Sequence, residues 1–182
     1  MNSTDRWLRT GAALAVVGGI VALVAVYIPA FVIKGPGVDT TEKLFRDWEG
    51  KVGLVSGAIM VLGGLALWVT DERTQRKLIA ALVGLATLVA IGSAAYAMSV
   101  FRSKALDSLA EAFAAQQRVP AAAVRPVLVL AVNRGALQLN GKLGVPLLIV
   151  GAGIAFFGTV AVFMSQRRRA APVVPATSPA AG

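Results

Sequence analysis

The sequence EGKVGL at positions 49–54 opens an uncharged, glycine-rich apolar run that extends to residue 70. Nearly the same sequence, NGKLGV at positions 140–145, opens a second run of this kind. Both apolar runs lead into basic clusters, which lie at positions 73–77 and 167–169. About 20 consecutive apolar residues are enough for a helix to cross the hydrocarbon core of a bilayer. The repeated pattern therefore predicts two related membrane spans, each followed by a basic cluster.

The overall composition is typical of a membrane protein. The 182 residues are 57% hydrophobic, and their mean hydropathy is +0.73. A soluble domain usually has an apolar share of roughly 45–50%, even when glycine is counted. The net charge of +9 comes from lysines and arginines that flank the apolar runs, where such residues set topology and contact lipid head groups. We therefore expect contacts with anionic lipid head groups and no binding of nucleic acid.

The chain contains neither cysteine nor histidine. Without cysteine there are no disulfides, no thiol redox chemistry and no iron–sulfur clusters. Without either residue, the usual haem ligation by His or Cys, the common zinc sites and the Ser-His or Cys-His nucleophiles cannot be built. The sequence therefore predicts a protein that is not an enzyme and has no cofactor or metal.

Four uncharged apolar runs predict membrane spans at residues 10–33, 52–70, 78–101 and 143–166. The first run is longer than the 7–15 residues of a signal-peptide core, which favours a retained anchor over a cleaved signal. Pro29 is expected to kink this span near its outer end. The fold class predicted from these runs is an all-α integral membrane protein, a compact bundle of four transmembrane helices.

The first predicted loop, residues 34–51, is short and carries an apolar helical face. Thr40 or Thr41 is a candidate cap for a short helix over residues 42–49, in which Trp48 lies on the apolar face. The sequence predicts that this helix lies on the membrane surface.

The second predicted loop, residues 102–142, is long enough to hold structure of its own. Ser103 is a candidate cap for an amphipathic helix, and its apolar face repeats at helical spacing through Leu106, Leu109, Ala110 and Phe113. Pro120 and Pro126 are expected to break the helical pattern. Residues 127–139 then fit either a β-hairpin or a second short helix, because a short apolar run does not distinguish the two.

The repeated Gly-Lys sequences suggest an internal duplication. In this interpretation residues 10–70 and 78–166 form two hairpins of the same topology, related by a pseudo-two-fold axis along the membrane normal. The alternative is chance similarity between low-complexity apolar segments. Both interpretations remain open at the level of the sequence.

The distribution of basic residues predicts the orientation. The N-terminus, the turn at 71–77 and the tail together carry eight Lys and Arg residues, while the longer loops 34–51 and 102–142 share ten. The eight lie in shorter segments, so their side has the higher density of Lys and Arg, and the side with the higher density is usually cytoplasmic. We therefore expect a four-span domain at residues 1–166 of the cytoplasmic (inner) membrane, with extracytoplasmic loops, both termini cytoplasmic, and a disordered tail at 167–182 that is basic and then rich in Ala and Pro.

Two kinds of candidate site residue follow from this arrangement. Small residues four positions apart allow helix backbones to approach closely, and the candidates for helix packing are Gly53, Gly57, Gly151 and Ala155. Basic residues at the span ends are candidates for contact with lipid or a partner, namely Lys51, Lys142, Arg167, Arg168 and Arg169.

None of the four predicted spans contains an ionisable acidic or basic residue. Ion-coupled carriers ordinarily keep such a group within the membrane, so its absence argues against transport. We therefore expect a non-enzymatic interaction module or accessory subunit of a membrane complex, with loop 102–142 as the surface for a protein partner. The alternative function is a small oligomeric transporter or channel-forming subunit.

Overall fold

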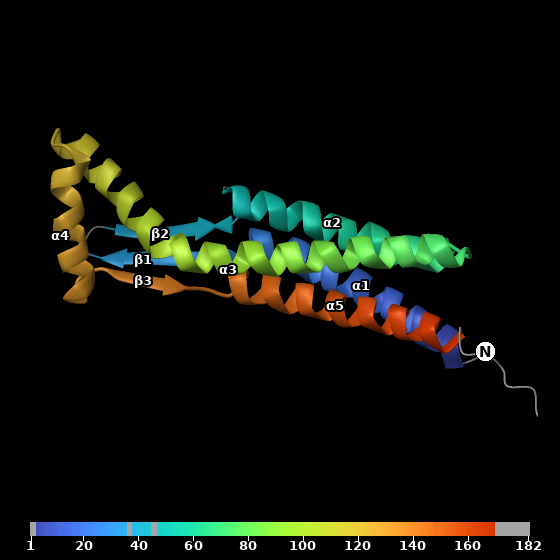
Figure 1. Cartoon of the computed structure of the whole chain (residues 1–182). Helices are drawn as coiled ribbons and strands as arrows, with labels where there is room; N and C mark the ends of the chain where they lie inside the picture. The colour runs from blue at the N-terminus through green and yellow to red at the C-terminus, as the bar shows by residue number, and fades with distance from the viewer. Residues whose placement is uncertain (1–2, 36–37, 45–46, 170–182) are drawn as a thin grey trace, which may run out of the picture.

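A computed structural model describes residues 3–35, 38–44 and 47–169. These residues form five helices and three strands: α1 Ser3–Tyr27, β1 Pro29–Gly35, β2 Val38–Lys43, α2 Trp48–Val69, α3 Arg73–Gln117, α4 Ala121–Asn133, β3 Gln138–Gly141 and α5 Gly144–Arg169. Figure 1 shows α1, α2, α3 and α5 running lengthwise as a bundle, with the three strands and α4 at one end.

Four helices, α1, α2, α3 and α5, are long and apolar enough to cross a membrane. Only 39–44% of the residues in their most apolar segments are buried inside the protein. The outward surfaces carry large apolar side chains, such as Leu62, Leu85 and Phe157, which are 60–70% exposed. A continuous apolar surface of this kind is covered by lipid in a multi-pass membrane protein. The structure thus agrees with the four apolar spans predicted from the sequence.

Helix α1 packs between α5 and α2, while α3 packs against α2 and α5 on the other side of the bundle. Glycines allow the close approach of α1 to α5. A Cβ atom added at Gly18 would lie 2.4 Å from the carbonyl oxygen of Gly151, and one added at Gly11 would lie 2.6 Å from that of Gly158. Backbone therefore meets backbone at this interface, as expected for membrane helices that associate through small residues.

The first helix is shorter at its outer end than the span predicted for residues 10–33. It ends at Tyr27, and residues Pro29–Gly35 form strand β1. Pro29 has no backbone N–H to continue the helical ladder, and the β-branched residues Val32 and Ile33 that follow it favour a strand. Pro29 therefore ends the helix, and the predicted kink was wrong.

Strand β1 is the centre of an antiparallel three-stranded sheet with the order β2-β1-β3. Ile33 lies opposite Thr40 of β2 and opposite Leu139 of β3. The prediction of an all-α fold was therefore wrong in this region. The short helix predicted over residues 42–49 was also wrong, because the β-branched Thr40 and Thr41 pair with β1 and α2 begins only at Trp48.

Helix α3 is a single helix of 45 residues. The sequence predicted a span at 78–101 and a separate amphipathic helix capped by Ser103, but no residue near position 102 interrupts the helix. The predicted apolar face is present, with Leu106, Leu109 and Ala110 buried. Figure 1 shows the last part of α3 leaving the bundle and reaching α4. The helix ends at Gln117, and the next residue, Arg118, caps it in a left-handed conformation with φ 55°.

The region after α3 contains a short helix and then a strand. Pro126 lies inside α4, so the prediction that it breaks the helical pattern was wrong. Pro126 has no N–H, so the carbonyl of Ala122, one turn earlier, loses its helical hydrogen-bond partner. Both residues are exposed, and this carbonyl can therefore bond to water instead. Gly135, with φ 74°, then turns the chain towards β3. Lys142 extends the pairing of β3 with β1, since its backbone N–H donates to the carbonyl of Ala30 at 2.7 Å.

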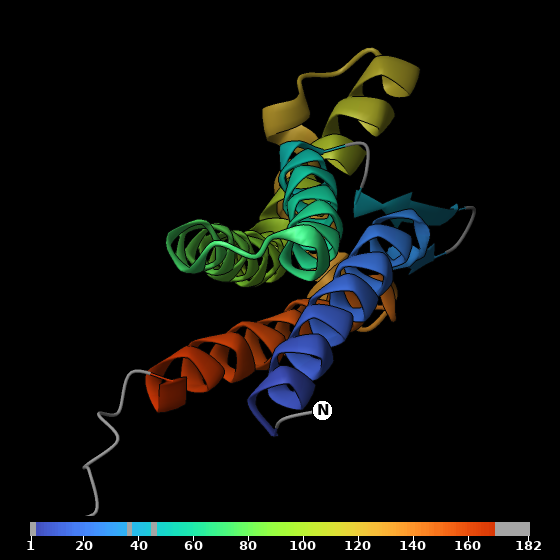
Figure 2. The ribbon, with the colours of Figure 1, turned by 90° about the vertical axis from the view of Figure 1, so that its right-hand side faces the viewer.

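We call the sheet, α4 and the part of α3 after residue 101 the cap. The cap has its own hydrophobic core, in which Ile33 of β1 meets Leu109 of α3, Leu128 of α4 and Leu137. Figures 1 and 2 place the start of α1, the end of α5 and the turn between α2 and α3 at the opposite end of the bundle. The duplication stays a prediction. The tail was predicted to be disordered from residue 167, but residues 167–169 belong to α5, and the rest of the tail lies outside the described residues.

Candidate functional site

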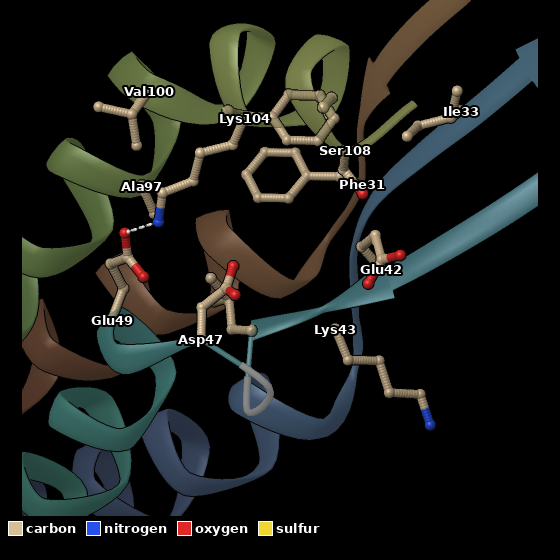
Figure 3. A pocket seen from close by; sticks show the side chains of 13 residues that line it. Phe31, Ile33, Glu42, Lys43, Asp47, Glu49, Ala97, Val100, Lys104 and Ser108 are labelled. Atoms are coloured by element: carbon tan, nitrogen blue, oxygen red, sulfur yellow. Dashed lines mark hydrogen bonds and ion pairs between the residues drawn. The ribbon is translucent and has the colours of Figure 1, made fainter. Parts of the chain in front are cut away.

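A pocket of about 170 Å³ lies where the cap meets the bundle. Its walls come from the start of α2, from α3 between Ala97 and Ser108, and from β1 and the end of β2 (Figure 3). The apolar wall includes Phe31 and Phe101, whose rings stack with their centroids 3.7 Å apart. Because one ring belongs to the sheet and the other to α3, this stack fixes the position of the cap beside the pocket.

Glu49 is the most deeply buried charged residue of the pocket. It lies in the first turn of α2, and only 2% of its surface is exposed. Its Oε1 accepts a hydrogen bond from Lys104 Nζ at 2.5 Å, and Figure 3 shows the lysine side chain reaching across from α3. A buried carboxylate is costly unless it is paired, so Lys104 and the positive end of the α2 dipole together stabilise Glu49.

The two oxygen atoms of Glu49 have different surroundings. Lys104 lies beyond the uncharged part of α3. The hydrogen bond to Oε1 raises the pKa of Lys104, so this side chain is positively charged at physiological pH. Glu49 Oε2, by contrast, is buried without a hydrogen-bond partner among the described residues. Such a buried acceptor is rare, since most buried polar atoms are paired with protein or water.

The other charged residues among the described lining are Glu42, Lys43 and Asp47, so that within this described set carboxylates outnumber ammonium groups by three to two. In the described part of the chain no three acidic side chains gather in a way that would hold a metal ion. The chain has no histidine or cysteine, so a Ser-His or Cys-His pair cannot form in the pocket. Its chemistry suits the binding of an organic group that donates hydrogen bonds.

Aromatic side chains place the pocket at the end of the apolar part of the bundle. Trp48 and Tyr96 lie on the adjoining turns of α2 and α3, with ring centroids 5.5 Å apart, and both are about half exposed. Exposed Trp and Tyr residues gather at the level of the lipid head groups. The uncharged run of α3 ends at Phe101, three residues before Lys104. The pocket is therefore expected to lie at head-group level.

The residues predicted for helix packing all lie against α1. A Cβ atom at Gly53 would be 3.2 Å from Val26, and one at Gly57 would be 2.9 Å from Leu23. On the opposite flank of α1, Gly151 and Ala155 of α5 surround Gly18, whose added Cβ would lie 2.5 Å from the backbone nitrogen of Ala155. These residues thus form two interfaces of one helix.

The basic residues predicted for lipid or partner contact are more dispersed. Lys51 and Lys142 are both exposed, and neither forms an ion pair with a described residue. Arg167 is exposed near the end of α5. The backbones of Arg168 and Arg169 belong to α5, while their side chains lie outside the described part of the structure.

Glu49 and Lys104 were not predicted from the sequence as a pair. A signal was present, because the short turn after residue 70 makes α2 and α3 antiparallel neighbours. Their far ends must then meet, and each far end carries a charge of opposite sign beside an uncharged run. What the sequence does not show is that Glu49 points inwards and becomes buried.

A second candidate site is the outer face of α4, which we call the α4 surface. It consists of Ala123, Pro126, Val127 and Leu130, all of them exposed; Val127 is 64% and Leu130 54% exposed. These positions recur at helical spacing and lie on the face opposite the buried Leu128.

Comparison with known protein families, with curated proteins and with solved structures finds no match. The function therefore has to be inferred from the α4 surface and the pocket. The α4 surface is apolar and the pocket is charged, so the two sites suit different ligands.

Proposed function

We propose that this protein is a non-enzymatic, membrane-anchored interaction module, and that the α4 surface binds a protein partner. The proposal is supported by one observation: α4, which lies at the outer end of the cap (Figure 1), has an exposed apolar face. Exposed contiguous apolar patches on folded domains often mark sites of protein interaction.

The protein's own bilayer is not expected to cover the α4 surface. Figure 1 shows the sheet between α4 and the ends of the bundle helices. The helix has 13 residues, which is too short to cross a bilayer. If the four long helices lie in the membrane, Val127 and Leu130 face water until a partner binds.

The charges around α4 indicate an acidic partner. Arg118 precedes the helix and Arg134 follows it, and both side chains are exposed. Neither forms an ion pair with a described residue, whereas Arg125 pairs with Asp107 at 2.6 Å. We expect the partner to present an apolar segment flanked by Asp or Glu residues, since complementary charges around an apolar contact provide specificity.

A photo-crosslinking amino acid placed at Val127 of the full chain tests this function in native membranes. We expect adducts with a different polypeptide, joined through an apolar segment that has acidic flanks. The same amino acid at Leu62, which is 66% exposed on the bundle, is the control and should yield mainly lipid adducts. In a second experiment the photo-crosslinking amino acid is placed at the neighbouring Ala123. Replacing both Val127 and Leu130 with serine should then abolish crosslinking to the partner.

Two outcomes would contradict the proposal. Lipid adducts at Val127, in the same pattern as at Leu62, would mean that α4 lies in or on a membrane. Adducts only between two copies of this chain would indicate self-assembly, and would favour an oligomeric transporter or channel-forming subunit instead.

The proposal includes an orientation, with both termini in the cytoplasm and the cap outside. The support is the higher density of Lys and Arg at the end of the bundle that carries the turn between α2 and α3. In intact cells, cysteine at Ser108 should react with a membrane-impermeant maleimide, while cysteine at Thr74 should react only after permeabilisation. The chain has no native cysteine, so the labelling is specific. The reverse pattern would mean that the cap is cytoplasmic.

A further inference from the structure

We infer that the pocket lined by Glu49 and Lys104 binds a primary ammonium group linked to a phosphate, and that the source of this group is the head group of phosphatidylethanolamine. This inference is independent of the α4 surface, because it rests on different residues at the other side of the cap. It depends on the unpaired oxygen of Glu49, on the second charge that Lys104 can contact, and on the position of the pocket.

Glu49 Oε2 requires a hydrogen-bond donor. The residue is 2% exposed, and no described donor reaches this oxygen. Oε1 is already paired with Lys104, so a ligand that binds at Oε2 completes the coordination of the carboxylate. Hydrogen bonds between ionised groups are shorter and stronger than neutral ones, which favours an N–H of a cation over a hydroxyl or an amide.

The surrounding charges also favour a cation at this position. Asp47 lines the same pocket and lies just before α2, two residues from Glu49. The ammonium of Lys104 faces two carboxylates, Glu49 and Asp47, both of which favour its charged form. Lys104 is therefore shared by two carboxylates of the described lining, and these favour a further cation beside Glu49.

Lys104 also provides a place for the anionic half of the ligand. Its Nζ has three donors, and Glu49 Oε1 takes one of them. The side chain is 45% exposed, so the other donors can reach a phosphate outside the pocket. A phosphoethanolamine group has the matching order of charges, because its ammonium can lie inside the pocket at Glu49 while its phosphate lies outside at Lys104.

The size and position of the pocket favour a lipid as the source. A cavity of about 170 Å³ is smaller than the roughly 300–1,000 Å³ of pockets that enclose whole drug-sized ligands, so it suits a head group alone. The exposed pair Trp48 and Tyr96 adjoins the pocket at the predicted head-group level. The acyl chains of a bound lipid would then lie along the exposed apolar surface of the bundle.

Native mass spectrometry of the full chain in detergent tests the inference. The probes are phosphatidylethanolamine, its N,N-dimethyl derivative and phosphatidylcholine with identical acyl chains. Their positive charge is the same, while the number of N–H donors falls from three to one to none. We expect retention to fall in this order, by about tenfold between the first and the last, because an ionic hydrogen bond to Glu49 is lost. Equal retention of the three lipids would overturn the inference.

The variant Glu49→Gln removes the carboxylate while keeping its shape, and it should abolish the preference among the three lipids. The matched control is Glu111→Gln, an exposed carboxylate on α3 beyond Lys104, which should retain the preference. A preference that survives in Glu49→Gln would overturn the inference. If this variant does not fold, the comparison of the three lipids on the wild-type protein still decides the question.

A competition experiment distinguishes the lipid from a soluble source of the same group. Free phosphoethanolamine is added at increasing concentration to the complex with phosphatidylethanolamine. Displacement only at a large excess supports the lipid as the ligand. Displacement at concentrations similar to that of the lipid would overturn the lipid assignment and identify a soluble phosphoethanolamine compound as the ligand.

Discussion

Gly151→Ala is expected to destabilise the bundle, while Gly153→Ala, on the same helix, leaves its stability unchanged or slightly raises it. The added methyl at Gly151 would lie 2.7 Å from both the nitrogen of Ala22 and the carbonyl oxygen of Gly18. These are backbone atoms of α1, so the contact is relieved only if the helices separate. Overpacking of this kind costs about 1–3 kcal/mol.

Gly153 provides the matched control, because nothing lies within 4 Å of its added methyl. Alanine also has a higher helix propensity than glycine, by up to about 1 kcal/mol. Thermal unfolding of the two variants in the same mild detergent compares them directly. If both variants melt at the temperature of the wild type, α1 and α5 are further apart in the protein than in the structure described here.

Lys104→Met is expected to destabilise the protein more than Glu49→Gln does. The lysine variant leaves a charged carboxylate buried without a partner, whereas the glutamine variant removes the charge. Loss of one partner from a fully buried pair costs roughly 3–5 kcal/mol. Because Lys104 is 45% exposed and water can reach the site, we expect about 2–3 kcal/mol.

The double variant Glu49→Gln with Lys104→Met should recover most of this loss, and this recovery measures the coupling between the two residues. Lys77→Met is the control, since Lys77 is an exposed lysine of α3 that forms no ion pair with a described residue. Losses that simply add in the double variant would mean that the two side chains do not interact.

The stability that the pair of Lys104 and Glu49 contributes depends on pH in a defined direction. The hydrogen bond to Glu49 raises the pKa of Lys104 above its ordinary value of 10.5. The contribution of the pair is therefore complete below pH 10.5, and it is lost as the pH rises through the higher folded-state pKa. The difference in stability between wild type and Lys104→Met should consequently stay constant from about pH 7 to 9.

The four long apolar helices were the most predictable part of the fold. Each is an uncharged run of sufficient length, and hydropathy depends only on local sequence. Residues 29–33 show where this approach fails. They are as apolar as the helix before them, so hydropathy includes them in the span although Pro29 ends α1 and β1 begins there. The helix-terminating effect of Pro29, given more weight than hydropathy, predicts this boundary correctly.

The sheet and the pocket depend on contacts between distant residues. Phe31 pairs with Gly141, and Glu49 meets Lys104 across 55 residues of sequence. No local pattern encodes such a pairing. Strand β3 spans only four residues, and the pattern around it fitted a hairpin or a helix equally well. The burial of Glu49 is likewise a product of tertiary packing, since a charge beside a span is ordinarily exposed to the interface.

The central position of β1 has a consequence for biosynthesis. Strand β1 directly follows α1, but its partner β3 is synthesised about 110 residues later, immediately before α5. Helix α1 precedes α5, the neighbour against which its glycines pack, by a still longer stretch of chain. During translation, one edge of β1 is therefore open and one face of α1 has no neighbour, and chain fragments that end before residue 138 remain in this state. Strand β1 and helix α1 can gain these partners only after β3 and α5 have been synthesised.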